Sequence, residues 1–361
     1  MQILITGSNG FVGKNLTFSL PEHELYLYDT DTDPALLDEY CKDAQFVFHL
    51  AGINRPENLD EFMSGNFGFT SLLLNTLKKH NNICPIVFSS STQATLDNPY
   101  GHSKLACENL LRTYAEKTGA PVIIYRFPNL FGKWCRPNYN SAIATFCYNL
   151  ARDLPITVSS PDTELTVMYI DDVINELRNA LGGKSEDFVT YEVTLGHIVG
   201  LIEEFKSGKK ELSVPDVSDS FAMKLYSTYL SYLPTSGFAY PLRMNVDNRG
   251  SFTEILRTEH HGQFSVTITK PGIIRGNHWH HTKVEKFLTV SGEGVVRFRR
   301  VDDTEIIEYK VSGDKHEVID IPPGYTHNIE NTGSNDMITF MWCTECFDPE
   351  HPDTASVDVY S

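Results

Sequence analysis

Two different rhythms of apolar and polar residues divide this chain of 361 residues. Up to about residue 205, short apolar runs alternate with longer stretches of helical periodicity. Strand-like runs lie at residues 3–5, 25–28, 46–50, 86–89 and 122–125. Helical patterns cover residues 10–20, 59–79, 101–117 and 140–152. Strands that alternate with helices indicate βαβ units, so we expect an α/β domain with a doubly wound parallel sheet of the Rossmann type.

The rhythm changes near residue 250 to short alternating strands. Such runs lie at residues 264–269, 285–290, 294–299, 317–321 and 337–342. With the glycine- and proline-containing turns between them, they indicate an all-β sandwich or barrel. The stretch 207–241 is rich in Ser, Pro, Gly and Tyr and is expected to hold the junction. We therefore predict two domains, residues 1–240 and 241–361, which a chain of this length allows.

The composition excludes several classes of partner. The chain has 30 Lys and Arg against 47 Asp and Glu, a formal net charge of −17. Sequence-independent binding to nucleic acid or to an anionic membrane needs basic surface and is not expected. No apolar run approaches the ~18 residues of a membrane span, and the chain opens on a strand-like segment rather than a secretory signal. Its seven Cys are scattered and form no disulfide framework, so a cytoplasmic location is expected.

A glycine-rich turn follows the first predicted strand and opens the first predicted helix. Its glycines, Gly7, Gly10 and Gly13, would let the backbone approach a pyrophosphate at the helix N-terminus. A tight strand–helix turn without a ligand is the alternative. Asp29 ends the second strand, where a carboxylate accepts hydrogen bonds from a ribose 2′-hydroxyl and repels a 2′-phosphate, which favours NADH. A turn-forming Asp is the alternative there.

A Tyr-x-x-x-Lys pair begins the third predicted helix. Tyr100 and Lys104 are one turn apart on one helix face, so the lysine can lower the pKa of the phenol, which then acts as general acid or base. Ser91, at the end of a serine-rich strand, offers a hydroxyl to polarise a carbonyl. A helix start with a solvated lysine is the alternative.

Together these residues resemble the extended short-chain dehydrogenase/reductases that act on nucleotide sugars. The likeness covers roughly residues 1–205 and includes Asn66 and segments 49–52, 126–132 and 169–173. It implies that Ser91, Tyr100 and Lys104 are catalytic and that Asn129 contacts the substrate. The cofactor site implied by the resemblance comprises Gly7, Asn9, Gly10, Phe11, Val12, Gly13, Asp29, Leu50, Ala51, Gly52, Tyr100 and Lys104. Leu165 and Thr166 stand where this family commonly has an arginine, so Lys133 or Arg136 would contact the diphosphate.

The second part carries a candidate metal site. His278 and His280, two residues apart on a strand, point to one face, Glu285 adds an oxygen, and His327 follows in a second cluster. Three histidines and a carboxylate suit Zn, Fe, Mn or Ni. Segments 272–292 and 322–331 resemble the two motifs of the cupin family, a jelly roll, although the leading glycine of the second is displaced to Gly313. The resemblance makes His278, His280, Glu285 and His327 the metal ligands.

Segments 247–254 and 275–278 further resemble the deoxysugar 3,5-epimerases, which share the jelly-roll fold. Those enzymes remove a proton next to a 4-keto group and return it on the other face. A Lewis-acidic metal on the ketone oxygen would stabilise the enolate. His281, Lys283 and Tyr325 are candidate proton carriers, although His281 and Lys283 are as readily part of a solvated turn. An anionic sugar nucleotide needs local donors, among them Arg136, Arg275 and Arg297.

The combination resembles, nearly end to end, the CapF-type family of bifunctional capsular-polysaccharide enzymes. That resemblance implies a UDP-sugar substrate, epimerisation at C3 by the cupin and reduction of the C4 ketone by the reductase domain, on a route to UDP-N-acetyl-L-fucosamine. It also implies NADPH and zinc as cofactors, whereas Asp29 favours NADH. A homodimer is the default expectation for both domain types. Two alternatives stay open: a cupin that only binds or dimerises, and an iron-dependent oxygenase cupin.

Overall fold

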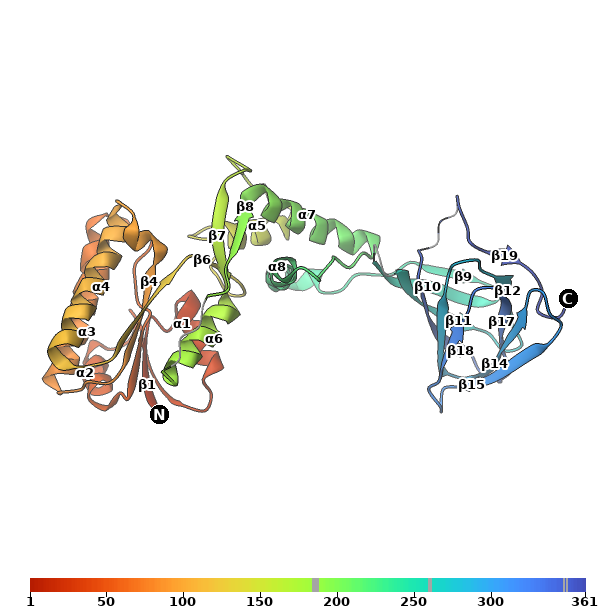
Figure 1. Cartoon of the computed structure of the whole chain (residues 1–361), viewed down its shortest axis with the longest axis horizontal. Coiled ribbons are helices and arrows are strands. Elements are labelled where there is room, and N and C mark those ends of the chain that lie inside the picture. Colours follow the sequence, from red (N-terminus) through yellow and green to blue (C-terminus); the bar gives the residue numbers. More distant parts are fainter. Residues whose placement is uncertain (184–187, 259–261, 347, 349) are drawn as a thin grey trace. The chain divides into compact units, whose positions relative to one another are not determined.

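The computed structural model describes residues 1–183, 188–258, 262–346, 348 and 350–361 (Figure 1). The chain forms two compact units. The first contains Met1–Glu203 and Ser220–Pro234, and the second contains Glu204–Asp219 and Thr235–Ser361. The chain thus passes between the units three times, whereas the sequence placed one boundary between residues 240 and 241. Within the described residues, no helix combines the length and apolar content that crossing a membrane needs.

A five-stranded parallel sheet forms the centre of the first unit, in the order β2-β1-β3-β4-β5. Its strands are β1 (Gln2–Thr6), β2 (Glu24–Tyr28), β3 (Phe46–His49), β4 (Ile86–Ser91) and β5 (Val122–Phe127). Its helices are α1 (Phe11–Ser19), α2 (Pro34–Asp43), α3 (Phe69–Lys79), α4 (Pro99–Thr118) and α6 (Ile170–Leu181). This confirms the predicted doubly wound α/β fold, because helices cover both faces of the sheet (Figure 1).

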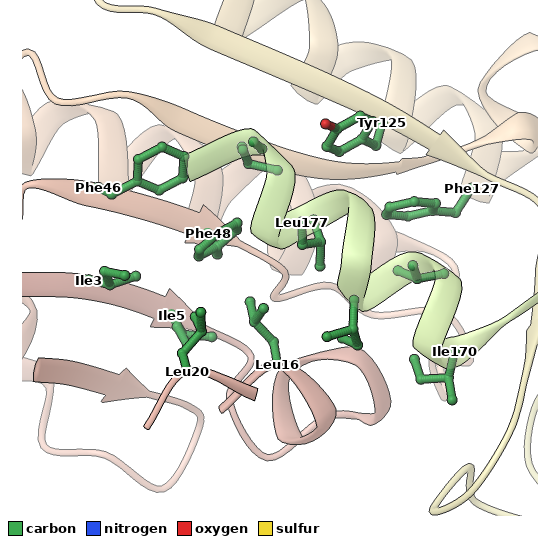
Figure 2. Packing of buried hydrophobic residues seen from close by; sticks show 14 of the residues in the cluster. Ile3, Ile5, Leu16, Leu20, Phe46, Phe48, Tyr125, Phe127, Ile170 and Leu177 are labelled. Atoms are coloured by element: carbon green, nitrogen blue, oxygen red, sulfur yellow. The ribbon is translucent and has the colours of Figure 1, made fainter. Parts of the chain in front are cut away.

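The side chains of β1 alternate between the two faces of the sheet, and both faces are buried. Ile3 and Ile5 point into a cluster with Leu16 of α1 and Leu177 of α6 (Figure 2). Leu4 packs in the cluster on the opposite face. The strand order reverses between β1 and β3, and ligands of open α/β sheets bind outside the carboxyl ends of the strands at such a switch point. The glycine turn after β1 and residues 50–52 after β3 both lie there.

The remaining elements of the first unit include a small second sheet, β6-β7-β8. They are η1 (Phe62–Gly68), η2 (Thr92–Thr95), β6 (Asn129–Phe131), α5 (Ala142–Leu150), β7 (Glu164–Tyr169), β8 (Tyr191–Thr194) and α8 (Ser220–Ser231). Helix α7 (Leu195–Glu211) begins in the first unit and continues into the second, to which η3 (Thr235–Gly237) also belongs. The helix expected over residues 59–79 has two parts, because the π-helical η1 precedes α3. Helix α8 lies in the stretch expected to be a junction but is part of the first unit, where Phe221, Leu225 and Tyr229 are buried.

The second unit is a pair of antiparallel sheets, as expected for a jelly roll. One sheet, in the order β16-β13-β18-β11-β10-β9, contains β9 (Met244–Asp247), β10 (Gly250–Thr258), β11 (Gly262–Thr269), β13 (Glu285–Ser291), β16 (Val318–Ile321) and β18 (Met337–Cys343). The other, in the order β15-β14-β17-β12-β19, contains β12 (Ile274–Trp279), β14 (Glu293–Arg300), β15 (Ile306–Ser312), β17 (Tyr325–Asn331) and β19 (Ala355–Ser356). Apolar residues such as Phe287, Val296 and Phe298 form the core.

Candidate functional site

The glycine turn after β1 is packed so closely that side chains are excluded. Gly7 has φ +72° and donates its N–H to the carbonyl of Tyr28 at 2.8 Å. A Cβ on Gly7 would lie 2.6 Å from the amide nitrogen of Ala51, and one on Gly13 would lie 2.1 Å from the carbonyl oxygen of Gly7. The turn therefore brings the N-terminus of α1 against the end of β3, where amides of a helix's first turn can bind an anion.

Asp29 joins the end of β2 to this turn. Its Oδ2 accepts the amide of Asn9 at 2.8 Å, and its Oδ1 accepts the amide of Thr30 at the same distance. The Asp29 carboxylate thus closes a local turn, as expected of a turn-forming Asp. It also faces the glycine turn, as expected of a residue beside a bound cofactor.

A buried polar network holds the ends of β1 and β3 in place. The hydroxyl of Thr6 lies 2.8 Å from Nδ1 of His49, and Nε2 of His49 lies 2.8 Å from the hydroxyl of Thr70. The amide of Ala51 donates to the same Thr6 hydroxyl at 3.3 Å. Burial lowers the pKa of His49 to about 3, so the ring is neutral: one ring nitrogen donates a hydrogen bond to one hydroxyl, and the other nitrogen accepts a hydrogen bond from the second hydroxyl.

Helix α4 begins at a well-defined cap beside the serine-rich end of β4. Asn98 accepts the amide of Gly101 at 2.8 Å, and Pro99 occupies the first turn. A Cβ on Gly101 would lie 2.2 Å from the carbonyl oxygen of Gln93, so the glycine lets the helix start against the turn that follows β4.

This start brings Ser91, Tyr100 and Lys104 together. The ammonium of Lys104 donates to the carbonyl of Ser89 at 2.8 Å and lies 5.9 Å from the ring centre of Tyr100. Burial raises the pKa of the Tyr100 phenol, and its hydrogen bond with Ser91 offsets part of that effect. Burial also lowers the pKa of Lys104 to about 8. At neutral pH the phenol holds its proton beside a positive charge.

Sequence reasoning missed Glu108, which lies directly behind this trio. Its side chain is 0 % exposed and accepts the hydroxyl of Ser90 at 2.6 Å and two nitrogens of Arg126 at 2.8 and 2.7 Å. Burial raises the pKa of Glu108, but these donors outweigh burial and hold it below the usual value. Ser90 lies between the two serines that contact Lys104 and Tyr100, so Glu108 fixes the strand end that carries them. Its position four residues after Lys104 on one helix face was the available signal.

Replacing Glu108 with Gln is expected to destabilise the first unit by about 1.5–3 kcal/mol, because it weakens charge-assisted hydrogen bonds and leaves Arg126 without its charge partner. Urea unfolding followed by circular dichroism measures the loss. Glu116→Gln, on an exposed position of the same helix, is the matched control and should change little. Equal stability of the two variants would contradict the anchoring role.

The residues of this unit that are predicted to contact the substrate already interact with other residues of the protein. Lys133 pairs with Asp171 at 2.5 Å, and the guanidinium of Arg136 lies 5.0 Å from the ring centre of Tyr139. Asn129 is exposed and donates to the carbonyl of Thr166 at 3.3 Å. Their contacts with a diphosphate stay predictions, and Lys133 would have to share its charge with Asp171.

In the second unit the four predicted metal ligands converge. One donor atom from each of His278, His280, Glu285 and His327 lies within 4.8 Å of the others. His278 on β12 stands opposite His327 on β17, next to an irregularity of register after Gly276. A Cβ on Gly276, whose φ is +105°, would lie 2.7 Å from the carbonyl oxygen of His327. This bulge re-aims His278 toward the cluster.

The donor atoms of this cluster fit a divalent metal ion. Nε2 of His280, Oε2 of Glu285 and Nε2 of His327 are buried and have no hydrogen-bond partner among the described residues. Both histidine nitrogens face that oxygen, at 3.5 and 3.3 Å. Burial lowers the pKa of His278 to about 4, which keeps its lone pair available. Buried polar atoms are nearly always bonded, so these unsatisfied atoms around one point support an ion as the shared partner.

Of the three candidate proton carriers, Lys283 contacts the cluster, with its ammonium 3.1 Å from Oε1 of Glu285. The ring of His281 packs on Trp279 with centroids 4.2 Å apart, and His281 is exposed. Tyr325 is half-buried at the edge of the core, and its carbonyl lies 3.3 Å from Nδ1 of His327. Catalytic roles for all three stay predictions.

The arginines expected to bind the sugar nucleotide differ in their surroundings. Arg275 is largely buried, with Nη2 3.3 Å from the carbonyl of Ile268, and its Nε has no partner among the described residues. Arg275 and Arg249 both form ion pairs with Asp247. Arg249 was not among the residues predicted from the sequence to bind the substrate. Arg297, in contrast, is already bound to Glu308 and Glu330, each at 2.6 Å. Arg275 therefore keeps an unpartnered buried donor for an anion, whereas the charge of Arg297 is already paired with two carboxylates.

Residues 3–188 match the NAD dependent epimerase/dehydratase family, and residues 245–355 match the polysaccharide biosynthesis C-terminal domain. A UDP-2-acetamido-2,6-beta-L-arabino-hexul-4-ose reductase from Pseudomonas aeruginosa is 41% identical over 368 residues, covering 99% of each chain. The crystal structure of the capsular polysaccharide assembling protein CapF from Staphylococcus aureus matches with a TM-score of 0.94 and 53% identity, covering 99% of this chain and 100% of that one. A structure of CapF with the inhibitor 3-isopropenyl-tropolone matches with a TM-score of 0.88 and 48% identity, at the same coverage.

Proposed function

The chain belongs to the NAD dependent epimerase/dehydratase family, and from that premise we propose that it is a bifunctional enzyme acting on one UDP-sugar at two sites. The cupin unit epimerises C3 of UDP-2-acetamido-2,6-dideoxy-β-L-arabino-hexos-4-ulose. The reductase unit converts the C4 ketone to an alcohol, which gives UDP-2-acetamido-2,6-dideoxy-β-L-talose. The observation that carries the proposal is the presence in one chain of a Ser–Tyr–Lys trio and a buried three-histidine, one-carboxylate cluster.

In the reductase unit, Tyr100 is suited to be the acid. A reduced nicotinamide, when bound, supplies hydride to C4. Tyr100 donates its proton to the C4 oxygen, since burial keeps the phenol protonated at neutral pH. Ser91 donates a hydrogen bond to the same oxygen and orients it. The ammonium of Lys104 stabilises the phenolate that remains, because the charge lies beside the tyrosine ring in a buried position.

In the cupin unit, the cluster is suited to a proton transfer next to a ketone. A divalent cation held by His278, His280, Glu285 and His327 would supply positive charge to a carbonyl oxygen. The ammonium of Lys283 adds a second positive group on the Glu285 side. Tropolone carries a ketone and a hydroxyl on adjacent carbons, a pair of donors that binds metal ions, and its use as an inhibitor of CapF supports the metal proposal.

The chemistry fixes the order of the two reactions. The proton at C3 is acidic only while C4 is a ketone, so epimerisation must precede reduction. Reduction then removes the ketone and prevents C3 from returning to its first configuration. The reductase unit therefore makes the inversion at C3 permanent.

The 4-keto sugar incubated with the protein in D₂O tests this function. Without cofactor, deuterium should enter at C3, and with reduced cofactor the talose derivative should form, both identified by NMR. Reduction at C4 without any exchange at C3, in protein with full metal occupancy, would leave the cupin as a binding or dimerisation module. Mass spectrometry of the bound metal tests the oxygenase alternative, which requires iron.

Asp29 predicts a preference for NADH over NADPH of about tenfold or more in kcat/KM, because its carboxylate faces the glycine turn and would repel a 2′-phosphate. No basic residue follows β2 before Lys42 to offset that repulsion. Asp29→Asn should narrow the preference, whereas Asp43→Asn, on an exposed position, should leave it unchanged. A wild-type preference for NADPH would contradict this interpretation and agree with the expectation from the CapF-type resemblance.

A further inference from the structure

The C-terminal segment of residues 353–357 contacts β12 and β17, His280, and the turn that precedes Glu285. Strand β19 pairs with the end of β12, where Ser356 stands opposite His278. The hydroxyl of Thr326, the neighbour of His327, donates to the carbonyl of Val357 at 2.5 Å. A segment more than 70 residues after His280 in the chain thus completes the surroundings of the cluster.

Asp353 makes the most direct of these contacts. Its backbone carbonyl accepts a hydrogen bond from Nδ1 of His280. A proton on Nδ1 leaves the lone pair of the ring on Nε2, the buried atom that lacks a partner among the described residues and faces Glu285. The contact therefore selects the tautomer that can bind a metal ion.

The side chain of Asp353 holds the turn between His280 and Glu285. Its carboxylate accepts the amides of His281, Thr282 and Lys283 at 2.9, 2.8 and 2.9 Å, and the hydroxyl of Thr282 at 3.1 Å. One carboxylate thus fixes three successive peptide units that separate two ligands. The same bonds keep the Asp353 carbonyl beside His280.

We propose that Asp353 is the positioning residue of the metal centre, fixing the tautomer of His280 and the spacing between His280 and Glu285. This inference rests on the metal centre of the proposed function and adds a residue outside both motifs that carry the ligands. Partners that orient metal-bound histidines typically contribute 10- to 100-fold, roughly, to metal affinity. We expect a loss of that size when the Asp353 carboxylate is removed.

The test compares Asp353→Ala and Asp353→Asn with Asp348→Asn in the full-length protein. Asp348 is a matched control, since its carboxylate also accepts a backbone amide, that of Glu350, but bonds none of the ligand-bearing residues described above. Zinc affinity is measured by competition with a chromogenic chelator, and the absorption spectrum of the Co²⁺-substituted protein reports the coordination geometry.

Weaker zinc binding by about 10- to 100-fold and an altered Co²⁺ spectrum in both Asp353 variants, with Asp348→Asn unchanged, would support the proposal. Unchanged affinity and spectrum in Asp353→Asn and Asp353→Ala would overturn it. Wild-type protein that binds neither ion would overturn the proposed metal centre itself, which separates the two failures. Thermal unfolding of the metal-free proteins checks that the variants fold. A purely structural role of Asp353 would lower their stability without changing the Co²⁺ spectrum.

Discussion

Tyr100→Phe is expected to lower the rate of C4 reduction by about 10²- to 10⁴-fold while leaving proton exchange at C3 intact. The substitution removes only the hydroxyl, so the ring can keep its packing against Phe62, at a centroid distance of 5.6 Å, and the charge of Lys104 stays in place. What is lost is the proton for the C4 oxygen. Cofactor oxidation with the 4-keto sugar measures the reduction, and deuterium incorporation in D₂O measures the exchange.

Tyr114→Phe provides the matched control, because Tyr114 is a buried tyrosine on the same helix whose hydroxyl donates to the carbonyl of Asn82 at 3.1 Å. That variant should lose one hydrogen bond, about 1 kcal/mol of stability, and keep its reductase activity. If Tyr100→Phe reduced the ketone as fast as Tyr114→Phe does, the acid would have to be another group. If it lost exchange at C3 as well, the two reactions would not be the separate steps that we propose.

Most of the reductase unit could be predicted from the sequence because its central strands are buried on both faces. Runs such as Ile3-Leu4-Ile5 are apolar at every position, and Leu4 packs away from its two neighbours. The intervening helices present an apolar face every three or four residues. Hydrophobic pattern alone therefore gives the five strands and helices α1, α3 and α4, although it missed α2 and α6. The glycine turn and Tyr-x-x-x-Lys pair then fall at the carboxyl ends of the strands.

The same reasoning failed for several strands of the second unit, since their inward faces are polar. In β17, Thr326 and Asn328 are buried, and in β10, Ser251 and Thr253 are buried. Apolar alternation identifies such a strand only where its other face is apolar, as in β11, in which Phe264, Val266 and Ile268 alternate with buried polar residues. The candidate ligands on β12 and β17 were instead found from motif spacing, which does not depend on hydrophobicity.

Residues whose partners lie far away in the chain were the hardest to predict from the sequence. Glu108 keeps helical spacing from Lys104 and was open to detection, but its partner Arg126 comes from β5. Asp353 lies far from its contacts in the chain, and one carboxylate binding three amides has no pattern in the sequence. The segment that forms α8 was predicted to be part of the junction between the domains. Its aromatic residues pack against partners, such as Phe131, that lie some 90 residues earlier in the chain.

His327→Ala should lower the rate of proton exchange at C3 by at least about 10²-fold, while reduction of a substrate already inverted at C3 continues. His327 is 1 % exposed, and its Nε2 faces Glu285 at 3.3 Å, so its removal takes one of four donors from the cluster. A metal ion used to polarise a ketone is worth several kcal/mol, and each 1.36 kcal/mol corresponds to about a tenfold change in rate. Exchange in D₂O and metal content per chain are measured on the same sample.

His316→Ala, at an exposed position before β16, is the matched control and should keep both metal and exchange. Removing the metal from wild-type protein with a chelator should reproduce the His327→Ala phenotype, and adding zinc back should restore exchange in wild type alone. Full exchange by metal-free wild-type protein would show that the cluster serves the fold rather than the chemistry. In that event the proton transfer would have to depend on Lys283 and its neighbours without a cation, because Lys283 is the positive side chain that already contacts Glu285.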